Sequence, residues 1–417
     1  MLGADYSRLF GSCLQRRGIR IVIRTLIALI AFPIICQGGR RLVWEFNLTG
    51  RLKDARGELE RLPHSIRALS FSPDETRLAV SVGLHEGEKN HTSHLVVFTV
   101  DDPTRSLRQI ETGNYSTPRY LSEHDALSWS ERGDHLIVRG SPRTRVVNLR
   151  EHTQCVPPGD INGFVGDQMI GKRGGFGFNP RGVHPSQWKS RLEWFGPDCQ
   201  AAASWEIDEN WVLKETIPGR GLVRLSRYLT LFREAEPELA AREELIVLDA
   251  NTRKVLRRWP LGNFKAPHLR LAEGGKSLCG GTIAQSSRSN VELRCWDLTT
   301  GTLIAEHPRV KGGVPFSVTP EATLVAAFDW DKIPTTPKIK IPEDLAGMRI
   351  VIWDFRAGRD LASWKPALQK MQYTRWKGMP MEIFIEILDD PFVFALSPKG
   401  RYLAEGGDDV IRLYAIE

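Results

Sequence analysis

The feature that most constrains the fold is a short phrase that recurs along the chain. Alternating apolar residues lead into an aromatic residue, an acid, a turn rich in Gly and Thr, and a second apolar run. The clearest copies are VELRCWDLTTGTL at 291–303 and RIVIWDFRAGRDL at 349–361, and weaker copies occupy 42–52 and 245–255. Because alternation with a period of two is typical of β-strands, each copy predicts two strands joined by a tight turn.

A second phrase lies upstream of most copies of the first. It consists of an apolar strand, a turn of the Ser-Pro type and another apolar strand, at 68–80 and 393–404, with good copies at 126–138 and 316–326 and a looser one at 269–278. Joined together, the two phrases form a four-stranded unit of about forty residues, the size of a propeller blade.

Across residues 41–417 these phrases resemble the WD40-repeat family of β-propellers, although the Gly-His pair common in that family does not occur in this sequence. The resemblance implies an all-β propeller, and we expect seven blades of four antiparallel strands, with six or eight as alternatives. The last unit, ending at 411–416, supplies only three strands, so we expect an N-terminal strand around Val43 to complete it, because ring closure removes exposed sheet edges. The expected blades span 66–110, 126–156, 157–207, 223–259, 268–307, 315–364 and 392–417.

Residues 1–40 form a separate basic segment. Residues 1–41 carry seven arginines and one acid, which is +6 of the net charge of +7, so the propeller is nearly neutral. A nearly neutral body argues against nucleic acid as the partner.

The apolar run at 25–36 has the length of a signal-peptide core, and the longer stretch 19–36 is a candidate membrane anchor. Arginines before the run favour export of the propeller. We therefore expect an extracytoplasmic propeller, secreted or anchored. The alternatives are an organelle transit peptide, or a cytoplasmic protein whose start site is misplaced.

Four long insertions interrupt the repeats, at 84–94, 233–242, 331–344 and 365–387. Loops after the second strand of a blade and loops between blades emerge on the same rim, where elaborated loops often mark a binding surface. We therefore predict a non-enzymatic platform that binds another protein. Its main anchors should be Trp, Tyr and Arg side chains, because the binding energy of an interface concentrates in a few residues of these types. The candidate partner-binding residues are Tyr373, Arg375, Trp376, Lys338 and Lys340. Trp188 and Trp194, which lie off the repeat register, are further candidates for a binding surface.

No catalytic residue, metal site or cofactor is predicted. Residues 166–172 have phosphate-loop spacing, but Arg173 replaces the Ser or Thr that binds magnesium. The metal-ligand types His85, His91 and His94 share one polar loop without a His-Glu-x-x-His helix. The alternative function is a propeller enzyme, a quinoprotein-like oxidoreductase or a hydrolase, with its site in the central channel.

Two of the six cysteines, Cys279 and Cys295, fall on neighbouring predicted strands. After export a disulfide between them is possible. Both also suit the role of small buried hydrophobic residues, which is the interpretation we favour.

Overall fold

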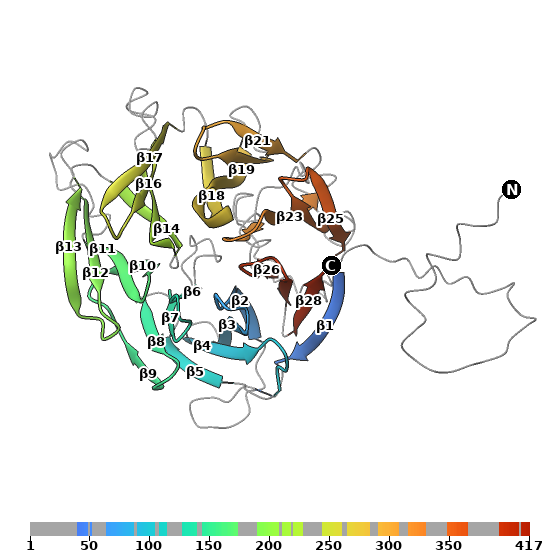
Figure 1. Cartoon of the computed structure of the whole chain (residues 1–417). Coiled ribbons are helices and arrows are strands. Elements are labelled where there is room, and N and C mark those ends of the chain that lie inside the picture. The colour runs from blue at the N-terminus through green and yellow to red at the C-terminus, as the bar shows by residue number, and fades with distance from the viewer. Residues whose placement is uncertain are drawn as a thin grey trace, which may run out of the picture. The chain divides into compact units, whose positions relative to one another are not determined.

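The computed structural model describes seven antiparallel sheets of four strands each, arranged as the blades of a propeller (Figure 1). The propeller belongs to a compact unit at 37–417. The described residues are 40–48, 51, 64–86, 90–104, 108–114, 127–139, 144–173, 190–207, 211–217, 220–227, 244–260, 265–283, 291–307, 316–330, 348–365, 392–407 and 410–417. The expected basic segment at 1–40, including its apolar run, lies outside them except for Arg40. In the described part, no helix has the length and apolar character needed to cross a membrane.

Blades 1 to 3 follow one another along the chain, each with its strands in sequence order. Blade 1 contains β2 (His64–Phe71), β3 (Arg77–Glu86), β4 (Asn90–Thr99) and β5 (Arg108–Asn114). Blade 2 contains β6 (Leu127–Trp129), β7 (His135–Val138), β8 (Arg145–Asn148) and β9 (Thr153–Cys155). Blade 3 contains β10 (Asp160–Val165), β11 (Gln168–Arg173), β12 (Ser190–Phe195) and β13 (Ala201–Ile207).

Blades 4 to 6 repeat this order. Blade 4 contains β14 (Trp211–Ile217), β15 (Leu222–Arg227), β16 (Glu244–Asp249) and β17 (Lys254–Pro260). Blade 5 contains β18 (Lys265–Ala272), a 3-10 turn (Glu273–Gly275), β19 (Ser277–Ile283), β20 (Val291–Asp297) and β21 (Leu303–Glu306). Blade 6 contains β22 (Phe316–Val318), β23 (Leu324–Trp330), β24 (Met348–Asp354) and β25 (Arg359–Trp364).

Blade 7 joins the two ends of the unit. It contains β26 (Phe392–Leu396), β27 (Tyr402–Gly407) and β28 (Val410–Ile416), and its outermost strand is β1 (Arg40–Asn47). Strand β1 pairs antiparallel with β28, from Arg40 opposite Ile416 to Asn47 opposite Val410. The predicted seven blades and the closure by an N-terminal strand are confirmed.

The first strands of the blades surround the axis. They pack in the ring order β2, β6, β10, β14, β18, β22, β26 and back to β2. Between the blades lie seven clusters of buried apolar side chains, one at each junction. The junction of blades 7 and 1, for example, buries Phe46, Ile66 and Phe98. Both faces of every blade are therefore covered, which explains the near-continuous apolar strands.

The Ser-Pro phrase forms the turn between the first and second strands. The hydroxyl of Ser72 accepts a hydrogen bond from the Arg77 N–H (3.0 Å), and Ser397 accepts one from the Tyr402 N–H (3.0 Å). Ser130 and Thr319 make the same contact five residues ahead. A buried side-chain oxygen thus replaces a missing ladder partner, which explains why the phrase requires Ser or Thr at this position.

The acid of the Trp-Asp phrase forms the turn between the third and fourth strands. The Asp297 carboxylate accepts hydrogen bonds from the Thr299 and Thr300 N–H groups (2.8 and 3.0 Å). Asp354 does the same for Arg356 and Ala357. The acid therefore recurs because it closes a turn.

The structure corrects two details of the predicted boundaries. Blade 4 begins with β14 rather than at Val223, because the sequence of β14 carries neither phrase. Most of the expected insertion at 84–94 is strand, since β3 continues to Glu86 and β4 starts at Asn90, with His85 opposite His91 in the register.

Candidate functional site

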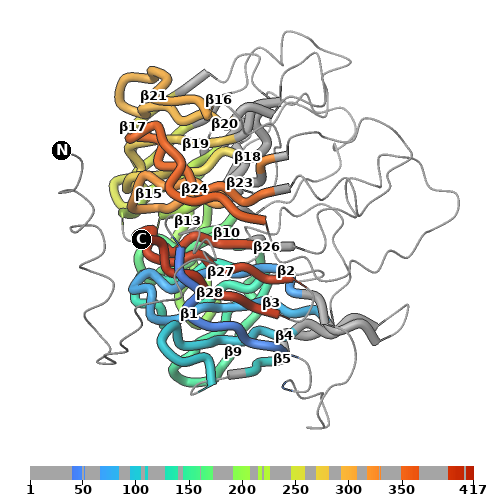
Figure 2. Tube along the Cα trace, turned by 90° about the vertical axis from the view of Figure 1, so that its right-hand side faces the viewer, coloured from blue at the N-terminus to red at the C-terminus, as the bar shows by residue number. Residues whose placement is uncertain are grey.

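The propeller has two unlike rims. The turn rim carries the connections from first to second and from third to fourth strand, which are short and almost completely described. The loop rim carries the connections from second to third strand and from blade to blade. The turn rim faces the viewer in Figure 1 and lies on the left in Figure 2.

The strand ends that flank all four predicted insertions lie at the loop rim. They are the facing ends of β3 and β4, of β15 and β16, of β23 and β24, and of β25 and β26, and the antiparallel registers put all eight on one side. The candidate residues Lys338, Lys340, Tyr373, Arg375 and Trp376 belong to these connections and lie outside the described residues.

The tryptophan Trp194 is part of the core, contrary to its prediction as a surface candidate. It is 5% exposed in β12 and packs with Val165, Ile170 and Val223 between blades 3 and 4. The repeat tryptophan Trp353 of blade 6, 2% exposed, packs on the other face of its blade, towards the preceding blade 5. Trp188 lies outside the described residues.

His94, one of the three histidines considered as metal ligands, is also buried. It is 3% exposed in β4, and its Nδ1 lies 3.2 Å from the side-chain nitrogen of Gln109. Across the described ranges, His, Cys, Asp and Glu side chains do not gather in threes as a metal site requires.

Charged side chains of one blade bind the inner backbone edge of the next. Arg224 of blade 4 donates to Glu215 (2.9 Å) and to the carbonyl of Leu269 in blade 5 (2.6 Å). The Leu271 N–H donates to both carboxylate oxygens of Glu215 (3.1 and 2.9 Å). The first strand of a blade has one edge without a neighbouring strand, so these side chains replace the missing ladder partners.

Two other junctions use the same device with different residues. Arg139 of blade 2 donates to the carbonyl of Asn162 in blade 3, and Ser317 of blade 6 accepts from the Leu396 N–H of blade 7 (3.0 Å). The polar groups at these inner edges therefore have defined structural roles. Sequence reasoning missed them, because the partners lie on different blades.

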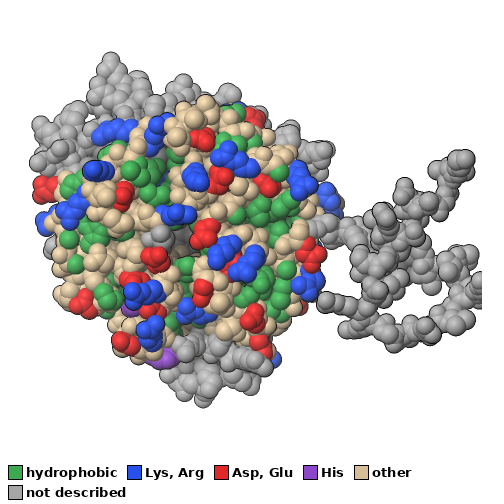
Figure 3. All heavy atoms as spheres, in the orientation of Figure 1, with side chains coloured by type: hydrophobic (Ala, Val, Ile, Leu, Met, Phe, Trp, Pro, Cys, Tyr) green, Lys and Arg blue, Asp and Glu red, His purple; other side chains and the backbone are tan. Residues whose placement is uncertain are grey.

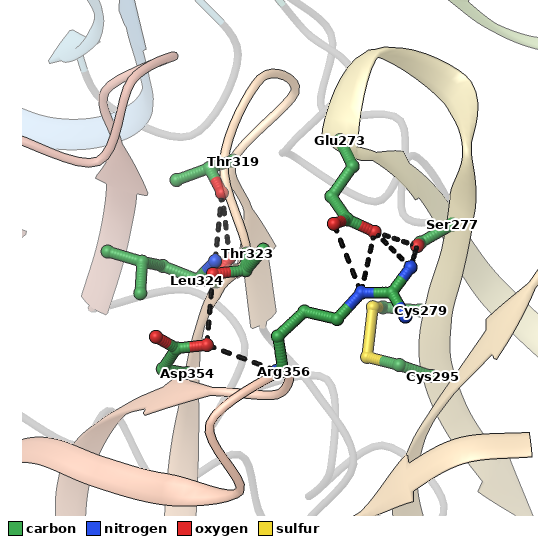
Figure 4. Close-up of a disulfide and its surroundings, with 9 residues drawn as sticks. All are labelled: Glu273, Ser277, Cys279, Cys295, Thr319, Thr323, Leu324, Asp354 and Arg356. Atoms are coloured by element: carbon green, nitrogen blue, oxygen red, sulfur yellow. Dashed lines mark hydrogen bonds and ion pairs between the residues drawn. A yellow bond between two sulfur atoms is a disulfide. The ribbon is translucent and has the colours of Figure 1, made fainter.

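The junction of blades 5 and 6 contains a charged cluster on the turn rim (Figure 4). Arg356 donates to the Glu273 carboxylate (2.9 Å) and approaches Asp297 (3.6 Å), and Ser277 also donates to Glu273. Burial alone raises the pKa of Glu273, but the hydrogen bonds from Arg356 and Ser277 outweigh it and lower that pKa. The same contact with Glu273 raises the pKa of Arg356. Both shifts favour the charged forms, and the ion pair holds two blades together.

The junction of blades 7 and 1 carries a buried acid, Glu75. Glu75 follows Asp74 in the turn between β2 and β3, and its side chain is fully buried. It accepts hydrogen bonds from the Lys399 N–H (2.6 Å) and from Arg401. This contact joins the turns of the first and last blades.

Arg40 anchors the closing strand against blade 6. Its guanidinium lies over the rings of Trp364 (4.2 Å) and Tyr414 (4.5 Å). Burial, with a smaller contribution from Glu405, raises the pKa of Tyr414 to about 12. Along the same seam Arg412 donates to Glu45 across β28 and β1 (2.7 Å).

The described residues contain two disulfides, one of which corrects our preference for unpaired Cys279 and Cys295. Cys279 and Cys295 are bonded across β19 and β20 and are fully buried. Cys155 at the end of β9 is bonded to Cys199 in the turn between β12 and β13, so this disulfide joins blades 2 and 3. The second pair was not predicted, because nothing in the spacing of 44 residues shows that the two blades meet there.

Comparison with known proteins identifies no family for this chain. No family model matches the chain, and no curated protein matches it. Among solved structures, the β-propeller domain of Cps50 (Swd1) from Myceliophteria thermophila aligns with a TM-score of 0.47 and 13% identity, over 86% of this chain and 98% of that one. The seven-bladed fold rests on the sheet topology of this chain itself.

Proposed function

We propose that this chain is a non-enzymatic, WD40-like platform that binds another protein through the connections of its loop rim. The observation that carries the proposal is that the strand ends flanking the insertions at 233–242, 331–344 and 365–387 all lie on one rim, together with the extended ends of β3 and β4. The opposite rim consists of short turns closed by their own Ser, Thr and Asp side chains. A repeat scaffold that elaborates one rim alone is typical of a binding protein.

Within this proposal, Tyr373, Arg375 and Trp376 are the principal anchors, and Lys338 and Lys340 contribute from the neighbouring insertion. Aromatic and arginine side chains dominate binding energy where they become buried in a partner. The lysines provide charge at the edge of the contact.

We further propose that the propeller is exported, either secreted or anchored through residues 19–36. The basic segment followed by an apolar run supports export. Two disulfides give independent support, because disulfides persist in oxidising compartments and are rare in reducing ones.

A propeller enzyme receives less support. It needs acids, histidines or arginines from several blades that converge on the axis. Three described charged groups at or beside the inner strands, Glu215, Arg224 and Arg139, bind the backbone of the next blade instead.

The test is affinity capture with the intact chain, a Tyr373→Ala/Arg375→Ala/Trp376→Ala variant, and a turn-rim control, Thr252→Ala/Thr299→Ala. We expect a partner recovered by the intact chain and by the control, and lost at least tenfold in the triple variant, as truncating anchor residues predicts. Equal recovery by all three proteins would overturn the loop-rim assignment.

A further inference from the structure

The turn rim has an uneven distribution of charge. Over blades 4 to 7, the described turns and adjoining strand ends expose nine Lys and Arg side chains and three acids. Over blades 1 to 3 they expose five acids and two arginines. Figure 3 shows this face, with blue side chains over its upper and right-hand part and red ones interspersed among them. We call the turn rim of blades 4 to 7 the basic face.

Ion pairs within the propeller engage part of the exposed charge in both halves. Three of the nine basic residues already pair with an acid: Arg41 with Glu417, Arg356 with Glu273, and Arg401 with Glu75. The other six are Arg220, Arg253, Lys254, Lys276, Arg359 and Lys399.

Both exposed arginines of blades 1 to 3 are paired, Arg132 with Asp167 and Arg150 with Asp134. The basic residues of that half are thus engaged with neighbouring acids, and the excess of exposed basic side chains belongs to the basic face.

The closing strand starts at this face. Arg40 is the first residue of β1 and lies opposite Ile416, at the turn-rim end of the outermost strand of blade 7. The apolar run ends at Cys36, and four residue steps reach at most about 14 Å. An anchored chain would therefore hold this end of blade 7 within a short distance of the bilayer surface, and anionic headgroups there would act on it over about a Debye length.

We propose that the basic face lies on an anionic lipid surface, so that the anchored propeller turns its loop rim, with the binding insertions, away from the membrane. The inference rests on the proposed anchoring. The ligand is the phosphate of acidic lipid headgroups, attracted by lysine and arginine side chains. A membrane is the favoured occupant over an acidic protein, because the chain leaves the propeller on the same face a few residues from an apolar run.

The experiment uses the full-length protein with vesicles of phosphatidylcholine alone and of equal parts phosphatidylcholine and phosphatidylglycerol. Flotation with vesicles of phosphatidylcholine alone tests the anchoring separately. Hydrogen exchange at low salt then tests whether the basic face contacts the lipid surface. We expect exchange in the turn between β24 and β25 to slow about tenfold or more on phosphatidylglycerol, and little on phosphatidylcholine.

Two double variants test whether the slowing depends on the basic face or only on the total charge of the protein. Arg359→Glu/Lys399→Glu reverses two charges on the basic face, and we expect it to abolish the phosphatidylglycerol-dependent slowing. Arg349→Glu/Lys365→Glu makes the same charge change at the loop-rim ends of blade 6 and should leave the slowing intact.

Equal exchange on both vesicles, or an equal loss in both variants, would overturn the proposal. Slowing by soluble poly-glutamate but not by phosphatidylglycerol would also overturn it, in favour of an acidic protein. Failure to float with phosphatidylcholine would refute the anchoring. The basic face would then stand as a lipid-binding surface only if phosphatidylglycerol still slowed the exchange without an anchor.

Discussion

The buried pair Arg224 and Glu215 gives the most exacting test of how the blades are held together. Its side chains are 4% and 15% exposed, and together they satisfy the Leu269 carbonyl and the Leu271 N–H of the next blade. In Arg224→Met the apolar stem remains while the charge and both donors are lost. Breaking a buried pair by removing one partner costs about 3–5 kcal/mol.

The double variant Arg224→Met/Glu215→Met separates the contributions. It removes the uncompensated charge and leaves the Leu269 carbonyl and the Leu271 N–H without these partners. An unsatisfied buried backbone group costs about 1–3 kcal/mol. We therefore expect the double variant to lose less stability than the sum of the single variants, by a coupling energy of about 1–3 kcal/mol.

The assay is urea unfolding followed by both tryptophan fluorescence and circular dichroism, since coincident transitions are required before a free energy of unfolding is assigned. Arg220→Met, in the exposed turn before β15, is the matched control and should change stability by no more than about 0.5 kcal/mol. An Arg224→Met variant as stable as this control, or strict additivity in the double variant, would refute the role assigned to the pair.

Three further outcomes are expected. Glu75→Gln should lower the free energy of unfolding by about 1–3 kcal/mol, because the ionic bond to Arg401 is lost at the closing junction, and urea unfolding measures it. Replacing Cys155 and Cys199 by serine should cost about 2–4 kcal/mol, checked by comparing oxidised wild type with the variant. Hydrogen bonds from the Thr300 and Thr299 backbone lower the pKa of Asp297, so its stabilising contribution is present above about pH 4 and lost as the pH falls through the lowered value. The urea midpoint of Asp297→Asn should depend less on pH in this acidic range than that of wild type.

The propeller was predictable because its turns depend on local chemistry. Ser72 and Ser397 bond to the backbone five residues ahead, and Asp297 and Asp354 to the backbone two and three residues ahead. Such contacts require particular residues at fixed spacing, so they remain visible as repeated phrases even where the rest of a blade diverges.

Contacts between blades produce no repeated pattern in the sequence. The strand β14 carries neither phrase, yet its Glu215 links blades 4 and 5. The bond between Cys155 and Cys199 joins two neighbouring blades across 44 residues of sequence. Trp194 looked like a surface residue because blade 3 lacks the repeat pattern that identifies a core position. Tertiary neighbours, rather than local sequence, determine all three.

The outermost strands of the blades are poorly suited to pairing with a strand of another protein. In six blades the outermost strand carries an extra residue that interrupts its ladder, and in blade 2 the outermost strand, β9, has only three residues. Bulges and short strands are the means by which proteins prevent other chains from pairing with an open sheet edge.

The inner edges are also occupied wherever Arg139, Arg224 or Ser317 binds the next blade. Backbone pairing with a partner strand is therefore disfavoured at both edges of the blades. Recognition then falls to side chains on the rims, and the two rims differ in kind: one has long insertions, and the other has short, self-closed turns with a one-sided positive charge. A protein partner would bind the insertions of the loop rim, and an anionic surface would bind the basic side chains of the turn rim.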